Sequence, residues 1–268
     1  MQDLHGKTAV ITGGGAGIGR AMCTTFADEG MNVVIVDREE DRAKEVAEEL
    51  KTKNVGTLAL SCDVSDAKAV EAMADAVYRQ FGACNLLCNN AGVVQFGAVA
   101  EAPQEHWDWL FKVNLWGVVN CIRTFVPRMK AQGSPGHIVN TSSLSGTFAV
   151  PGLGVYTASK YAVMGISETL RMELKDTDIG VSVLCPGPTP SRIGETAKST
   201  FTPGEPMFDV SDEDADLRYL GSREASVVAG CVRDGVKANR LYIFSHNPGQ
   251  IAVKKRFEQM LEDFKVAP

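Results

Sequence analysis

The sequence predicts a doubly wound α/β fold, in which a parallel sheet carries helices on both faces. Short runs rich in β-branched residues alternate with amphipathic stretches as far as about Leu184. This alternation is typical of parallel strands joined by right-handed crossovers. No internal repeat or Pro/Gly/Ser linker divides the 268 residues, so we expect a single domain over residues 1–268.

Seven segments are predicted to be strands: Thr8 to Thr12, Asn32 to Val36, Thr57 to Ser61, Cys84 to Cys88, His137 to Thr141, Val181 to Leu184 and Leu241 to Phe244. Helical patterns are predicted between them: from about Arg20, then Arg42 to Leu50, Lys68 to Phe81, Trp107 to Met129, Tyr156 to Leu174 and Arg223 to Val232. Ligands bind at the carboxyl ends of the strands in such sheets, so the residues just after each strand are candidate site residues.

Two segments interrupt the alternation. Residues 187–221 are rich in Pro, Gly, Ser and Thr, and so long a stretch without strong periodicity is typical of a lid over a functional site. Residues 247–268 form a C-terminal tail in which Ile251 to Phe264 is predicted to be an amphipathic helix. Its apolar side is expected to pack on its own domain or on a neighbouring subunit.

Composition excludes several classes of partner. The net charge of −6 argues against nucleic acid or an anionic membrane surface. There is no apolar run of 18 residues and no signal-peptide core, so a soluble cytoplasmic protein is expected. The seven cysteines include no C-x-x-C pair, and Cys84 and Cys88 lack a zinc-type partner motif, so no metal site is expected.

A glycine turn follows the first predicted strand. Thr12, Gly13, Gly17 and Gly19 fit the pattern T-G-x-x-x-G-x-G, with Ile18 between the last two glycines. Glycines let the backbone approach a pyrophosphate, whose charge the amides and dipole at a helix N-terminus favour. The sequence therefore predicts a dinucleotide site at this turn.

The second strand ends at an acid. Asp37 stands where a carboxylate accepts hydrogen bonds from the adenosine ribose and repels a 2′-phosphate. This position favours NAD over NADP. The neighbouring Arg38 offers an alternative, because a guanidinium can bind that phosphate, although a solvated charge at the helix start is the favoured interpretation.

Tyr156 and Lys160 lie one helical turn apart, so their heads can converge on one point. A nearby cation favours a phenolate and lowers the pKa of the tyrosine. The pair is therefore predicted to act as a general acid and base.

Together with these residues, Asp63-Val64, Asn89-Asn90-Ala91-Gly92, Asn114, Ser143 and Pro186-Gly187 resemble the motifs of the short-chain dehydrogenase/reductase family along nearly the whole chain. The resemblance implies a Rossmann-type sheet and an NAD(P)-dependent oxidoreductase acting on a secondary alcohol or ketone. It also implies a homodimer or homotetramer that pairs through the long helices Trp107 to Met129 and Tyr156 to Leu174.

The same resemblance implies individual roles. The catalytic residues would be Asn114, Ser143, Tyr156 and Lys160, with Ser143 preferred over Ser142 because it lies thirteen residues before the tyrosine. Lys160 would also bind the nicotinamide ribose. Further cofactor contacts would come from Asp63 and Val64 near the adenine, Asn90, Ala91 and Gly92 on the adenosine side, and Pro186, Gly187, Thr189 and Ser191 near the nicotinamide carboxamide.

The substrate is predicted to be a bulky hydrophobic secondary alcohol or ketone, aromatic or alicyclic. Residues 186–193 are similar to the corresponding stretch of bacterial dehydrogenases that oxidise benzylic alcohols of aryl ethers. Arg192 is expected to pin the lid to Glu195 or Asp209, or else to hold a substrate carboxylate. The predicted substrate contacts are Val94, Ser145, Phe148, Leu153, Arg192, Phe201, Met207 and Phe208.

Two other functions are compatible with the fold. One is a non-enzymatic dinucleotide-binding regulator. The other is a 3-oxoacyl carrier-protein reductase, against which Asp37 and the acidic charge balance argue.

The four histidines, His246 among them, are expected to be surface or packing residues.

Overall fold

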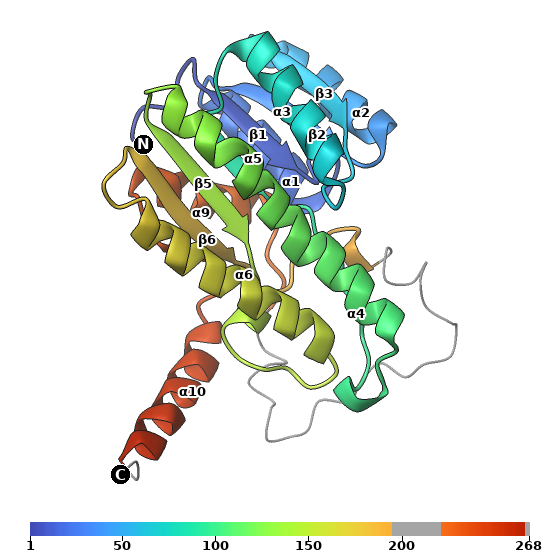
Figure 1. Cartoon of the computed structure of the whole chain (residues 1–268), viewed down its shortest axis with the longest axis vertical. Coiled ribbons are helices and arrows are strands. Elements are labelled where there is room, and N and C mark those ends of the chain that lie inside the picture. Colours follow the sequence, from blue (N-terminus) through green and yellow to red (C-terminus); the bar gives the residue numbers. More distant parts are fainter. Residues whose placement is uncertain (195–220, 266–268) are drawn as a thin grey trace.

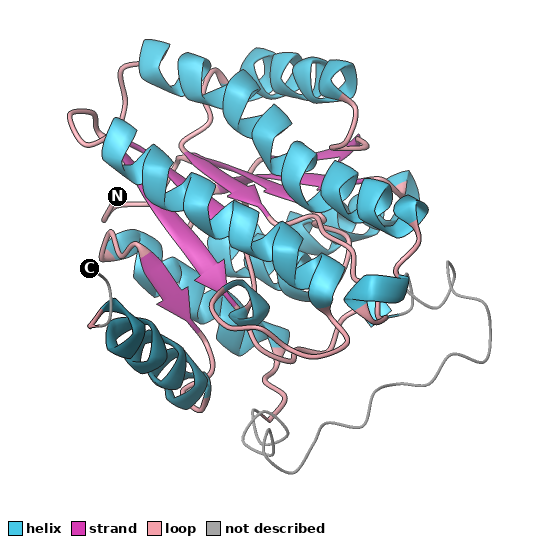
Figure 2. Ribbon diagram, turned by 60° about the horizontal axis from the view of Figure 1, so that its bottom comes forward, coloured by secondary structure: helices cyan, strands magenta, loops and turns pink. Residues whose placement is uncertain are grey.

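A computed structural model of the chain describes residues 1–194 and 221–265. Its centre is a seven-stranded sheet in the order β3-β2-β1-β4-β5-β6-β7, with every neighbouring pair parallel (Figure 2). The predicted fold class is therefore confirmed. The strands are β1 Thr8–Thr12, β2 Asn32–Asp37, β3 Thr57–Ser61, β4 Leu86–Asn89, β5 Gly136–Thr141, β6 Ile179–Cys185 and β7 Tyr242–Phe244.

Helices cover both faces because side chains alternate along each strand. Ile11 packs with α1 and α9 on one face, whereas its neighbour Val10 packs with α3 and α5 on the other. In Figure 1, α3, α5 and α6 lie in front of the sheet. The long helices are α1 Gly17–Asp28, α2 Glu40–Leu50, α3 Ala67–Phe81, α4 Gln104–Leu110, α5 Gly117–Ala131, α6 Gly154–Glu173, α9 Ala225–Lys237 and α10 Gly249–Phe264.

The predicted helix from Trp107 to Met129 is not a regular α-helix throughout. It consists of α4, a π-helical turn over Phe111–Trp116, and α5. A π turn adds a residue to the helical repeat and changes the direction of the side chains that it carries. Here it contains Asn114, which is completely buried.

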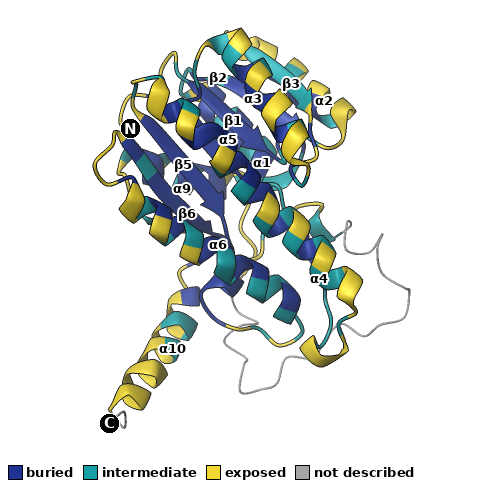
Figure 3. Cartoon of the chain, viewed as in Figure 1, coloured by how far each residue is buried: buried dark blue, intermediate teal, exposed yellow. Residues whose placement is uncertain are grey.

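The C-terminal helix α10 begins at Gly249, two residues before the predicted start at Ile251. It projects from the body of the molecule, and Figure 3 shows that most of its surface is exposed. Arg256 lies 5.2 Å from the centre of the Tyr161 ring in α6, but Leu261 and Phe264 remain 64% and 70% exposed. Much of its apolar side is therefore not packed against the described part of the chain. Among the described residues, no helix is long and apolar enough to cross a membrane.

The order in which strands are added to the sheet reverses direction between β1 and β4. β2 and β3 extend from β1 on one side, and β5 to β7 extend from β4 on the other. Loops that leave the carboxyl ends of β1 and β4 diverge at this point, which creates a crevice where open α/β sheets bind ligands.

Candidate active site

The glycine turn lies between β1 and α1. Gly13 and Gly17 have φ values of +64° and +52°, which residues with a side chain rarely adopt. A Cβ on Gly19 would lie 2.0 Å from the Gly13 carbonyl oxygen, so that position also needs glycine. The helix begins at Gly17, three residues before the predicted start, and no side chain caps its N-terminus at Ala16. The first amides of α1 are thus available to an anion.

A hydrogen-bond network fixes this turn to the segment after β4. The Thr12 hydroxyl accepts from the backbone N–H groups of Asn90 and Ala91, at 2.9 and 3.1 Å, and donates to the Cys88 carbonyl. The Asn90 side-chain amide donates back to the Thr12 carbonyl at 3.1 Å. Thr12 and Asn90 therefore tie the two halves of the sheet together at the crevice.

Asp37 ends β2 and faces the glycine turn. Its Oδ2 accepts from the Gly15 N–H at 3.0 Å, and its Oδ1 accepts from the Glu39 N–H at 3.0 Å. A carboxylate has about four acceptor sites, so oxygen lone pairs remain for ribose hydroxyls. Arg38 is exposed at the rim.

Asp63 and Val64 follow β3. The Asp63 carboxylate accepts from the Ser65 N–H at 2.9 Å. Burial raises its pKa, but the Ser65 hydrogen bonds and the positive charges of Lys112 and Arg38 outweigh burial and give a net lowering. Asp66, rather than Asp63, caps α3. Asp63 is therefore an ionised acceptor at the end of the crevice near Asp37.

The two serines after β5 have different environments. The Ser142 hydroxyl donates to the Lys160 carbonyl at 2.8 Å and thereby fastens the strand end to α6. The Ser143 hydroxyl accepts from the Ser145 N–H at 3.1 Å, and Ser143 lines the same cavity as Tyr156. This difference favours Ser143 as the candidate, because the Ser142 hydroxyl is committed to a helix contact.

Tyr156 and Lys160 lie on one face of α6 as predicted, with the ammonium 5.6 Å from the centre of the phenol ring. Lys160 Nζ donates to the Thr141 carbonyl at 3.0 Å. Burial raises the pKa of Tyr156, and the Ser143 hydrogen bond only partly opposes that shift. The lowered tyrosine pKa predicted from the spacing is therefore wrong for this structure, because burial outweighs the effect of Ser143. Burial also lowers the pKa of Lys160, to about 8.

Asn114 lies behind Lys160 in the π-helical turn. Its side chain accepts from the Val93 N–H at 2.8 Å and donates to the Val93 carbonyl at 2.9 Å and to Ser159 Oγ at 3.0 Å. A Cβ on Gly92 would lie 3.2 Å from Asn114 Oδ1 and 3.4 Å from Lys160 Nζ. Gly92 thus leaves room for the asparagine and lysine heads to converge.

The loop after β6 forms the opposite rim. The Pro186 carbonyl accepts from the Leu144 N–H at 3.0 Å, next to Ser143. Ser191 lies against the glycine turn, since a Cβ on Gly17 would be 2.7 Å from its Cβ. The Thr189 hydroxyl donates to the Gly187 carbonyl at 3.2 Å.

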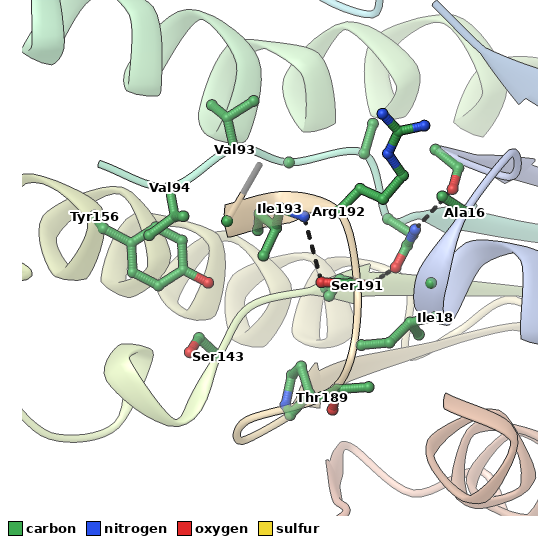
Figure 4. Close-up of a pocket in the computed structure, with 18 of the residues that line it drawn as sticks. Ala16, Ile18, Val93, Val94, Ser143, Tyr156, Thr189, Ser191, Arg192 and Ile193 are labelled. Carbon is green, nitrogen blue, oxygen red and sulfur yellow. Dashed lines mark hydrogen bonds between the residues drawn. The ribbon is translucent and has the colours of Figure 1, made fainter. Parts of the chain in front are cut away.

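These segments enclose one cavity of about 770 Å³. In Figure 4, Tyr156 and Ser143 lie at one end, and Ala16 and Ile18 lie at the other. Three predicted residues do not line the cavity themselves but lie behind the residues that do: Thr12, Gly19 and Asn114. The other predicted cofactor and catalytic residues line the cavity: Gly13, Gly17, Ile18, Asp37, Arg38, Asp63, Val64, Asn90, Ala91, Gly92, Ser143, Tyr156, Lys160, Pro186, Gly187, Thr189 and Ser191.

The predicted substrate contacts divide into two groups. The described ones, Val94, Ser145, Phe148, Leu153 and Arg192, all line the cavity. The others, Phe201, Met207 and Phe208, lie outside the described residues, as do Glu195, Asp209 and most of the predicted lid. Ile193, which was also expected to approach the substrate, lines the cavity as well, whereas the sequence prediction missed Phe96 and Val150, which add apolar surface without belonging to any motif.

Comparison with known proteins agrees with this geometry. The family model for short chain dehydrogenases matches residues 7–200. The 1-deoxy-11-beta-hydroxypentalenate dehydrogenase of Streptomyces exfoliatus is 34% identical over 99% of this chain and 92% of its own length. The C alpha-dehydrogenase of Sphingobium sp. strain SYK-6 is 33% identical over 100% of this chain and 89% of its own.

A solved structure is similar along the whole fold. A short chain dehydrogenase/reductase from Burkholderia phymatum, in complex with NAD, superposes with a TM-score of 0.88 at 34% identity. The superposition covers 98% of this chain and 97% of that one.

Proposed function

Because the chain belongs to the short-chain dehydrogenase family and is therefore an oxidoreductase, we propose that it is an NAD-dependent dehydrogenase of hydrophobic secondary alcohols. The observation that carries the proposal is the single cavity, which joins the glycine turn and Asp37 to Ser143, Tyr156 and Lys160. A volume of about 770 Å³ lies within the usual range for ligand and cofactor sites.

The residues present fit a nicotinamide dinucleotide. The uncapped N-terminus of α1 offers backbone N–H groups to a pyrophosphate, and the glycines leave the space that it needs. Asp37 offers carboxylate oxygens to the adenosine ribose, and Asp63 offers an acceptor farther along the crevice.

Asp37 supports NAD as the preferred cofactor. A 2′-phosphate placed at its carboxylate would meet a like charge in a half-buried position. Arg38 is exposed at the rim, where a contact with that phosphate would be screened by solvent. The NAD complex of the Burkholderia phymatum relative is consistent with this choice.

The chemistry divides between cofactor and protein. The nicotinamide supplies or accepts the hydride. Ser143 holds the substrate oxygen, and the Tyr156 hydroxyl exchanges a proton with it. Lys160 provides positive charge beside the tyrosine and a donor for the ribose, while Asn114 fixes the Val93 backbone behind both. Since burial raises the pKa of Tyr156, the neutral phenol favours donation to a carbonyl, and alcohol oxidation should accelerate as the pH rises.

The described wall of the cavity supports a bulky apolar substrate. Val94 and Phe148 are buried there, and Phe96, Val150 and Leu153 extend the same surface. Such a wall selects by shape and buried area, with each methylene contributing about 1 kcal/mol. We therefore propose an aromatic or alicyclic alcohol.

Steady-state kinetics with both cofactors test this proposal. A benzylic or cyclic secondary alcohol should exceed a short hydroxy acid in kcat/KM, and Tyr156→Phe should abolish turnover while NAD still binds. Near-normal rates in Tyr156→Phe would exclude the proton-transfer role. A higher kcat/KM for the hydroxy acid would exclude the proposed substrate class.

A further inference from the structure

His246 lies in the loop that follows β7, behind the site rather than in it. The sequence prediction treated it as a surface or packing residue, and the structure shows that it is buried, with only 1% of its surface exposed. Its ring touches the loop that follows β6: the Gly187 N–H donates to Nδ1 at 3.0 Å, and Nε2 lies 3.0 Å from the Pro188 carbonyl oxygen. The Ser245 hydroxyl lies 2.9 Å from Nδ1.

These partners determine the form of the imidazole. A backbone N–H can only donate, so Nδ1 must accept, and a carbonyl can only accept, so Nε2 must carry the proton. The ring is therefore neutral with its proton on Nε2. Burial lowers the pKa of His246, the Pro188 carbonyl opposes that shift, and the positive charge of Arg223 lowers it further. Of the described charged groups, Arg223 is the one that acts on the ring.

The ring also sets where the loop can lie. A Cβ on Gly187 would lie 2.8 Å from Cγ of His246, so the imidazole occupies the space behind the glycine. Pro186 on one side is bonded to the Leu144 N–H, beside Ser143, and Pro188 on the other accepts from the Arg223 N–H at 3.0 Å. The same loop also lines the cavity, through Gly187, Pro188 and Thr189.

We propose that His246 is a positioning residue whose neutral imidazole holds the Gly187 and Pro188 backbone against the nicotinamide end of the cofactor. The assignment rests on the proposed function. Protonation of Nδ1 would place one N–H against another at Gly187, so the loop would move away and the cofactor would bind less tightly in acid.

Two variants test separately the hydrogen bonds that the ring makes and its ability to titrate. His246→Asn keeps an oxygen that can accept from the Gly187 N–H but does not titrate, whereas His246→Ala removes both loop bonds. We expect NAD to bind wild type less tightly at about pH 5 than at about pH 7, a range in which Lys160 stays charged, and His246→Ala to raise the Kd about tenfold or more at pH 7. His246→Asn should recover most of that affinity and lose the dependence on pH. Calorimetric titration measures the Kd for NAD of wild type, His246→Ala and His246→Asn at both pH values.

His137 offers a matched control. It is another fully buried histidine bonded to a serine, with Nε2 2.7 Å from Ser182 Oγ, but it lies at the start of β5, at the opposite end of the sheet from the cavity. His137→Ala should lower the stability and leave the Kd for NAD unchanged.

The outcomes are distinguishable. Unchanged NAD binding in His246→Ala, equal losses of binding in the His137 and His246 variants, or no effect of pH on wild-type binding would each overturn the positioning role. Failure of the wild type to bind either nicotinamide cofactor would overturn the proposed function, and this inference with it.

Discussion

Replacing Lys160 by methionine should stabilise the protein while it abolishes turnover. The lysine is only 3% exposed, and burial lowers its pKa from 10.5 to about 8. Because a pKa difference of one unit corresponds to about 1.4 kcal/mol, keeping this ammonium charged lowers the free energy of unfolding by about 3 kcal/mol below pH 8. Lys160→Met removes that cost but leaves the Thr141 carbonyl without its donor, which costs about 1 to 2 kcal/mol. The free energy of unfolding should therefore rise by about 1 to 2 kcal/mol near pH 7.

The sign of the pH dependence follows from the direction of the shift. Between about pH 8 and 10.5 the unfolded lysine still binds a proton that the folded lysine has lost, so the stability of the wild type rises with pH through this window. The advantage of Lys160→Met should shrink accordingly and vanish near pH 9.5. Urea unfolding followed by circular dichroism, without cofactor and at both pH values, measures the difference.

The control is Lys175→Met, at an exposed lysine just beyond the end of α6. It should show no comparable change with pH. If Lys160→Met were less stable than wild type near pH 7, or if its advantage did not vary with pH, the burial argument would be refuted. Retained turnover in this variant would refute the catalytic role of the lysine.

Three other predictions follow from the cavity. Asp37→Ala should reduce the NAD-to-NADP ratio of kcat/KM about tenfold, and equal use of both cofactors by the wild type would contradict the role of this acid. Gly17→Ala, with φ at +52° and Ser191 in the way, should weaken NAD binding about tenfold in titrations, whereas Gly82→Ala, with φ at +75° and open space around it, should only lower stability by about 1 kcal/mol. Light scattering should detect a dimer or tetramer, since Trp116 on the expected pairing helices is 52% exposed, and a monomer at micromolar concentration would contradict it.

The sequence was sufficient to predict the sheet because each strand has a local signal. Buried parallel strands are short β-branched runs, and all seven predicted segments are strands whose ends differ by at most two residues. The helix from Trp107 to Met129 was predicted less well. Its π turn contains Asn114, whose side chain is bonded to Val93 and Ser159, both distant in sequence, and helical periodicity alone does not reveal such contacts.

The candidate site shows the same division. Thr12, Asp37, Ser143 and Tyr156, which the structure places in or directly behind the cavity wall, could be selected from the sequence because they belong to motifs with fixed spacing. The pKa of Tyr156 was not, because the spacing to Lys160 gives the position of the charge but not the burial of the ring. His246 belongs to no motif, and its contact with Gly187 spans 59 residues. Only the folded chain brings this histidine, which follows the last strand, into contact with the loop after β6.

The free-energy cost of burying the charged Lys160 is itself an argument that this residue has a function. An apolar side chain of similar length would satisfy the packing at this point without the cost of a buried charge, so stability alone does not explain a lysine there. The surroundings do not neutralise the charge either, because the group that Lys160 is bonded to is a neutral carbonyl, and burial remains the dominant influence on its pKa. What the position offers is a set of neighbours: the Tyr156 ring, the cavity, and the gap at Gly92 that leads to Asn114. A destabilising cation placed among them is consistent with the proposed proton transfer beside a bound ribose.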